Sequence, residues 1–167
     1  MNMYLLSQFL WFVVMLVVQA LLLNNIHLFG CSTPLLYVYV ILMARRDFPR
    51  WGLLLFGFLL GLGVDMFSNT PGVGACSMTL LAFVQPMLMK LFLPRDSADD
   101  FQPGIPSLGL MKFVYFSFIS IFLYSLVFFT LEMFNFFNWL YWLECVAGSI
   151  AVTSVLLLVI ENVRSRR

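Results

Sequence analysis

Charged residues are scarce in this chain of 167 residues, in which lysine and arginine number nine, aspartate and glutamate eight, and histidine one. They make up 10% of the sequence, whereas a soluble globular domain has about 25%. Hydrophobic residues make up 62%, and the mean hydropathy is +0.98. This composition excludes an ordinary soluble domain and indicates an all-α integral membrane protein. The formal net charge of +1 gives no electrostatic basis for binding nucleic acid.

The sequence also lacks the groups of residues on which catalysis and metal binding depend. His27 forms no recognisable catalytic motif with a serine, cysteine or carboxylate, and a role as proton carrier is its alternative. The three cysteines have neither a disulfide pattern nor zinc-site spacing. Asp96, Asp99 and Asp100 are more simply a solvated loop than a cation site. We therefore expect no catalytic, cofactor or metal site and no enzyme activity.

Six apolar runs divide the sequence. The first, residues 4–23, exceeds the roughly 7–15 apolar residues of a signal peptide and lacks a basic flank, which indicates a retained transmembrane helix. The chain is expected to form one integral membrane domain, residues 1–167, built as a bundle of six transmembrane helices. The helices are predicted at residues 4–23, 26–44, 51–67, 73–93, 108–133 and 139–160, followed by a cytoplasmic tail at 161–167.

The second helix is the least regular of the six. Its apolar part, residues 35–44, is about half of the roughly 20 residues that cross a bilayer, so it spans only if residues 26–33 join it. Pro34 would then lie inside the helix and kink it. Five crossings are the alternative, but they would leave half a crossing with unsatisfied backbone groups, and we therefore favour six.

The basic residues predict the topology. All nine lie in the 45–50 turn, in the 90–112 region or in the tail that begins at Arg164, and two crossings separate each group from the next. The three groups therefore share one face of the membrane, and the positive-inside rule makes that face cytoplasmic. Six crossings place both termini in the cytoplasm, and five place the N-terminus outside.

One helix face inside the third run is small and polar. Gly57, Gly61 and Asp65 are four residues apart and so fall on nearly one side of a helix. A charge facing hydrocarbon costs roughly 2.5 kcal/mol or more, so this face is expected to be a helix-packing or partner interface. The polar turn that follows is expected to supply turn and capping residues: Ser68, Asn69, Pro71 and Gly72.

Three interpretations of Asp65 remain open at this point. In the first, its carboxylate accepts hydrogen bonds from backbone amides of the turn between Asn69 and Gly74, where a helix N-terminus begins. In the second, the Gly57, Gly61 and Asp65 face contacts a partner protein. In the third, Asp65 binds a substrate or a proton in a cavity, and Glu132 and Glu144 also fall toward that outer side.

The same stretch carries a family resemblance. Gly61-Leu62-Gly63-Val64-Asp65, followed by Ser68 and Pro71-Gly72, in a chain of this size with six apolar runs, resembles the bacterial rod shape-determining protein MreD family. The layout matches over the whole chain, and the residue-level match covers about residues 57–74.

This resemblance implies a non-enzymatic subunit of the machinery that builds the lateral cell wall, in the bacterial cytoplasmic (inner) membrane. MreD proteins associate with MreC, a single-pass membrane protein, and act with RodA, a class B penicillin-binding protein and the MreB filament. Their six-helix fold is similar to that of the S components of energy-coupling-factor transporters. The implied contacts are thus an MreC-like partner and membrane lipid.

The alternative from another functional class is the substrate-binding membrane component of a small-molecule transporter, of the vitamin-binding type. Such S components have a similar size and helix count, but they typically carry small residues four apart in the first helix. Here such a pair, Ala147 and Ala151, lies in the sixth run, and long polar outer loops that could close over a ligand are missing.

A reporter protein fused before residue 1 tests the six-helix topology. We expect activity from a reporter that works only in the cytoplasm, because six crossings return the chain to the side on which it begins. A signal only from a reporter that works outside the membrane would show five crossings.

Overall fold

The computed structural model describes residues 35–46, 48–68, 70–93, 103–133 and 139–165 of the chain. In these ranges every regular element is a helix. The helices are α2 (Val38–Leu42), α3 (Arg50–Ser68), α4 (Val73–Phe92), α5 (Ile105–Leu108), α6 (Leu110–Glu132) and α7 (Trp139–Ser165). Four of these helices, α3, α4, α6 and α7, are long and apolar enough to cross a membrane. The chain is therefore an all-α, multi-pass membrane protein.

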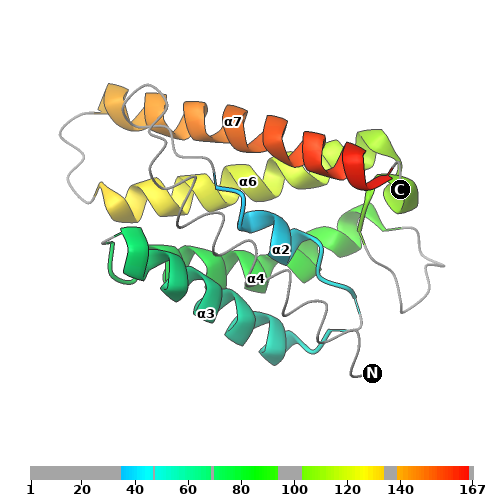
Figure 1. Cartoon of the computed structure of the whole chain (residues 1–167), viewed down its shortest axis with the longest axis horizontal. Helices are drawn as coiled ribbons and strands as arrows, with labels where there is room; N and C mark the ends of the chain where they lie inside the picture. The colour runs from blue at the N-terminus through cyan, green and yellow to red at the C-terminus, as the bar shows by residue number, and fades with distance from the viewer. Residues whose placement is uncertain (1–34, 47, 69, 94–102, 134–138, 166–167) are drawn as a thin grey trace.

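The four long helices lie side by side in the order α7, α6, α4 and α3 (Figure 1). Packing is most extensive between α3 and α4, and α2 lies against α4 and α6. The end of the bundle with the C-terminus also carries the start of α3, the end of α4 and the start of α6. The basic residues of the described ranges therefore gather at one end, as the sequence predicts. The side of the membrane that this end faces stays a prediction.

The predicted bounds of the third and fourth helices are confirmed to within one residue, because proline and glycine mark both. Pro49 precedes α3, and Pro71-Gly72 precedes α4. Gly72 has φ +89°, a left-handed conformation that glycine adopts without strain. The helix α4 then continues through Pro86 to Phe92.

The prediction for the fifth helix needs a correction at its start. The sequence predicts a loop up to residue 107 and one helix from 108, but the structure has the short helix α5 at Ile105–Leu108 and a break at Gly109. Gly109 has φ +81°, so the chain turns there before α6 begins at Leu110. The acids at 96, 99 and 100 lie outside the described residues.

The second predicted helix is described only in part. From residue 35 onward its regular portion is α2, whose five residues rise about 7.5 Å, far less than a membrane thickness. This segment is buried, with Tyr37, Val38, Ile41 and Leu42 all at 0% exposure. The first predicted helix, His27 and the start of the second lie outside the described residues, so the count of six crossings stays a prediction.

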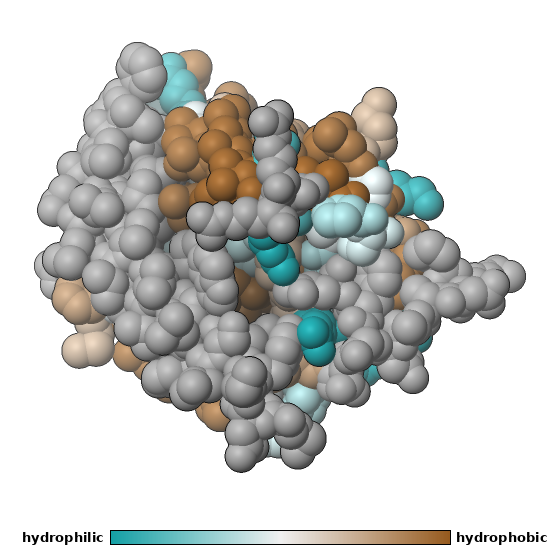
Figure 2. Space-filling model, turned by 45° about the vertical axis from the view of Figure 1, so that its right-hand side comes forward, coloured by the Kyte–Doolittle hydropathy of each residue, from teal (hydrophilic) through white to brown (hydrophobic). Residues whose placement is uncertain are grey.

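The phenylalanines of α6 divide between the core and the outer surface. Phe113, Phe116 and Phe129 are buried, whereas Phe118 and Phe122 are exposed. Large apolar side chains are likewise exposed on the other long helices, and the coloured surface in Figure 2 is mainly hydrophobic with small hydrophilic areas. Outward apolar side chains suit a helix bundle surrounded by lipid.

A buried glutamate in α7 corrects the predicted cytoplasmic tail. The helix was predicted to end at residue 160, but α7 continues to Ser165, and Glu161 is only 2% exposed. Its carboxylate accepts hydrogen bonds from the Tyr39 hydroxyl at 2.7 Å and from the Ile105 amide at 3.2 Å. Arg164 lies 3.7 Å from the same carboxylate and donates to the Tyr39 hydroxyl at 3.2 Å. Residues far apart in sequence thus tie α2, α5 and α7 together.

Replacing Glu161 tests this connection. We expect Glu161→Ala to lower the free energy of unfolding by about 3 kcal/mol, because it leaves one buried and one partly buried donor without their acceptor. Tyr39→Phe removes one donor and is expected to cost about 1 kcal/mol. Thermal unfolding in detergent, followed by circular dichroism, measures both. Equal losses for the two variants would contradict the role assigned to Glu161.

Candidate functional site

Asp65 lies in the last turn of α3 and faces the start of α4. Its side chain is 4% exposed. One carboxylate oxygen, Oδ1, accepts hydrogen bonds from the Gly74 amide at 2.8 Å and the Thr70 hydroxyl at 3.2 Å. The other, Oδ2, accepts from the Ala75 amide at 2.9 Å and the Gly72 amide at 3.1 Å. Both oxygens are thus engaged by the turn and first residues of α4.

The position of this carboxylate is explained by the first backbone amides of α4, which require hydrogen-bond acceptors. The first amides of any α-helix have no partner within the helix, and a side chain at the N-cap position usually accepts from them. Here the N-cap is Gly72, which has no side chain. Asp65 supplies the missing acceptor from the neighbouring helix, and its negative charge meets the positive end of the α4 dipole.

Glycines allow α3 and α4 to come close enough for these bonds. A Cβ atom at Gly61 would meet the Gly74 carbonyl oxygen at 2.5 Å and the Ala75 Cα at 2.6 Å. A Cβ atom at Gly74 would meet the Asp65 carboxylate at 2.6 Å. At Gly57 the contact is less tight, with 3.1 Å to the Met78 carbonyl oxygen. The face predicted from the four-residue spacing therefore packs against α4 of the same chain.

These contacts bear on the three interpretations of Asp65. The structure contains the amide hydrogen bonds that the first interpretation expects, and Gly57, Gly61 and Asp65 are all buried against α4. A partner helix cannot occupy that face while α4 does. Of the predicted turn residues, Ser68 ends α3, Pro71 is exposed, Gly72 donates its amide to Asp65, and Asn69 lies outside the described residues.

Thr70, Gly74 and Ala75 complete the site, and of these the first interpretation of Asp65 names only Gly74, as the end of the turn that supplies the amides. Thr70 lies inside the predicted turn, and a glycine two positions after Pro71-Gly72 is the only local sign of the close approach at 74. The Gly72 and Gly74 amides lie within the turn that the first interpretation names, whereas the Ala75 amide lies one residue beyond it.

A second group of buried polar side chains lies between α2, α6 and α7. The hydroxyls of Tyr37 and Tyr124 are hydrogen-bonded to each other, and both rings are fully buried. The Leu35 amide donates to the Thr153 hydroxyl at 3.1 Å. Ser120 is also fully buried and donates to the Phe116 carbonyl. These residues join the second predicted helix to α6 and α7, a connection that apolar runs alone do not predict.

Two of the cavities in the described part of the chain are lined by residues of α3 and α4. The first is a shallow groove of about 580 Å³, lined mainly by apolar and small side chains of both helices, among them Phe58, Cys76, Thr79 and Phe83. The second is a more enclosed pocket of about 250 Å³ near the start of α3 and the end of α4, and it is lined partly by basic residues. Binding chemistry on this part of the chain would therefore be apolar at one place and anion-attracting at the other.

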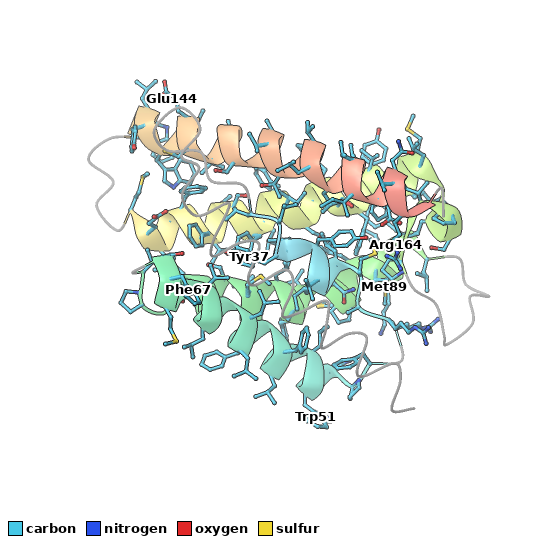
Figure 3. All side chains as sticks on the ribbon, in the orientation of Figure 1. Tyr37, Trp51, Phe67, Met89, Glu144 and Arg164 are labelled. Atoms are coloured by element: carbon cyan, nitrogen blue, oxygen red, sulfur yellow. The ribbon has the colours of Figure 1, made fainter. Side chains whose placement is uncertain are left out.

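Glu132 and Glu144, the two acids predicted toward the same side as Asp65, are both exposed, whereas Asp65 is buried. Glu144 is exposed and lies at the same end of the bundle as Phe67 in the last turn of α3 (Figure 3). Glu132 ends α6. In the described residues no three side chains among histidine, cysteine, aspartate and glutamate come together as metal ligands would.

Replacing Asp65 tests its structural role. We expect Asp65→Asn to lower the free energy of unfolding by about 3 kcal/mol or more, because the amide group offers one acceptor oxygen where the carboxylate offers two. Thr70→Val removes the longest of the four bonds and is expected to cost about 1 kcal/mol. Thermal unfolding in detergent compares the two. A loss for Asp65→Asn no larger than that for Thr70→Val would show that the amide bonds contribute little.

Comparison with known proteins finds no relative of this chain. The chain matches no family model, no curated protein and no solved structure at a significant level. The fold class and the geometry around Asp65 therefore rest on the chain itself, and the likeness of residues 57–74 to the MreD family remains a prediction.

Proposed function

We propose that this protein is a non-enzymatic scaffold and regulatory subunit of the bacterial cell-elongation (Rod) complex in the cytoplasmic membrane. It binds an MreC-like single-pass membrane protein and, through it, supports RodA, a class B penicillin-binding protein and MreB in lateral peptidoglycan synthesis. Polymerisation chemistry belongs to those other subunits. Both termini lie in the cytoplasm.

The observation that carries this proposal is the α3–α4 hairpin built from residues 57–74, the part of the chain that resembles the MreD family. Its acid is buried and fully engaged with backbone amides, and its glycines are in contact with α4. A scaffold needs such a rigid pair of helices. A proton-transfer or ligand-binding acid would instead need access to water or to a cavity.

The groove on the outer side of this hairpin is the surface we assign to the partner helix. Its lining includes Gly72 and Cys76 four residues apart, and Ala75 and Thr79 four residues apart, and small residues at this spacing let two helices approach closely. The Thr79 hydroxyl donates to the Ala75 carbonyl at 2.7 Å, so its hydrogen-bond donor is satisfied within α4. Phe58 and Phe83 flank the small residues and are both exposed.

This assignment revises the surface that the sequence favours for a partner. Gly57, Gly61 and Asp65 face inward to α4, whereas Cys76 is exposed on the outer side of the same hairpin. A transmembrane helix can therefore dock there without displacing the packing of Gly57, Gly61 and Asp65 against α4. From Gly72 to Phe83 the groove follows α4 for about 16 Å, roughly half of the membrane core.

Filling the groove tests the proposal. We expect Cys76→Trp to reduce co-purification with an MreC-like protein roughly tenfold or more, because overpacking a helix contact costs about 1–3 kcal/mol. Val155→Trp is the matched control, since Val155 is 61% exposed on α7, away from the groove. The two proteins are co-expressed and captured in mild detergent, and the recovered partner is quantified.

Gel filtration and thermal unfolding establish that both variants are folded before they are compared. Equal recovery of the partner with Cys76→Trp and Val155→Trp would remove the groove as the docking surface. Failure of the wild-type protein to capture an MreC-like protein would overturn the scaffold function itself. Co-purification of a vitamin or of an ATPase pair would instead favour the transporter alternative.

A further inference from the structure

Four basic residues surround the pocket at the start of α3 and the end of α4. Arg45 and Arg46 come from the segment after α2, Arg50 begins α3, and Lys90 lies in the last turn of α4. The 45–50 segment also contains Asp47, so by sequence that segment carries two net positive charges, and Lys90 adds a cation from α4. Four cations drawn from three segments around one pocket attract an anion more strongly than scattered surface charges do.

The interior of this pocket is not purely basic. Its lining includes Phe48, Leu53 and Met89, of which Leu53 and Met89 are buried at 4% and 3% exposure. Gln85 is 1% exposed, and within the described residues its amide donates to the Met89 sulfur at 3.9 Å. A thioether sulfur is a weak acceptor, so the buried amide keeps donor capacity for an oxygen in the pocket.

The location of the pocket suits the membrane surface. It lies at the beginning of the spanning helix α3, beside Trp51, which is 73% exposed. Figure 3 shows Trp51 at the start of α3 and Met89 near the end of α4, toward the end of the bundle that also carries Arg164. Tryptophan gathers at the level of lipid head groups, so the pocket lies at that level too.

We propose that this pocket binds the phosphate group of an anionic phospholipid, with the phosphate among Arg45, Arg46, Arg50 and Lys90 and the glycerol part against the apolar lining. Its volume of about 250 Å³ equals that of roughly eight water molecules, which leaves room for a phosphate and the groups attached to it. This assignment does not rest on the proposed function.

A lipid fits this pocket better than a free phosphate does. Both would engage the four cations, but only a lipid would also cover Phe48 and Leu53 with apolar atoms. A lipid is moreover present at high local concentration beside a helix that spans the membrane. Basic pockets between transmembrane helices near the surface are known to hold anionic head groups.

Lys90 and Lys112 provide a matched test. Both are exposed lysines on long helices at the same end of the bundle, but only Lys90 lines the pocket. We expect Lys90→Gln to weaken retention of phosphatidylglycerol about fivefold, since one cation near an anionic head group contributes about that factor. Lys112→Gln is expected to leave retention unchanged, and Lys90→Arg to restore it.

Occupancy is measured by native mass spectrometry of the full chain in neutral detergent. The protein is titrated with phosphatidylglycerol and, separately, with phosphatidylcholine of the same acyl chains. Preference for phosphatidylglycerol that is weakened about fivefold in Lys90→Gln but unchanged in Lys112→Gln supports the proposal. Gel filtration verifies that each variant is folded.

Three results would overturn the proposal. Equal binding of the two lipids would show no recognition of anionic charge. Equal losses for Lys90→Gln and Lys112→Gln would show diffuse surface attraction in place of a pocket. Displacement of phosphatidylglycerol by inorganic phosphate at constant ionic strength would show that a soluble anion is the occupant.

Discussion

The start of a helix inside a membrane needs acceptors for its first amides, and this protein meets that need with one buried carboxylate. Without water, each unsatisfied amide costs several kcal/mol. Asp65 receives three amides of α4, and the lack of a Cβ atom at Gly61 and Gly74 leaves the space that these bonds require. The hydrogen bonds, the glycines and the close packing of α3 on α4 are thus one arrangement. A larger side chain at Gly61 or Gly74 would therefore separate α3 from α4 and weaken the hydrogen bonds of Asp65.

The opposite end of the bundle repeats the same physical solution with different residues. Glu161 accepts from the amide of Ile105 near the start of α5, as Asp65 accepts from amides near the start of α4. It also binds the Tyr39 hydroxyl and so holds α2, which is too short to be stable alone. Each buried acid therefore connects helices that the apolar contacts only bring near one another. Acids used in this way fix the relative positions of helices.

The sequence predicts α3 and α4 well and includes the acceptor role among its three interpretations of Asp65, because the signals involved are local. Apolar runs end at Pro-Gly turns, and a four-residue spacing places two glycines and an acid on one face. It does not predict the role of Glu161, since a glutamate followed by Arg164 and further charges resembles a solvated tail. The partners of Glu161 lie 122 and 56 residues away, and no local pattern encodes such distances. The break at Gly109 was missed because the apolar run continues across it.

The inward packing of the polar face determines what the α3–α4 hairpin can offer to other molecules. Because Gly57, Gly61 and Asp65 are covered by α4, a partner has to use other surfaces of this pair, among them the outer groove and the basic pocket. Cys76 in the groove and Lys90 at the pocket are about 21 Å apart along α4. A partner helix in the groove and a lipid at the membrane surface would therefore not exclude each other. Both would contact the same rigid hairpin, so an anionic lipid bound at its end would hold the groove at a constant depth in the membrane.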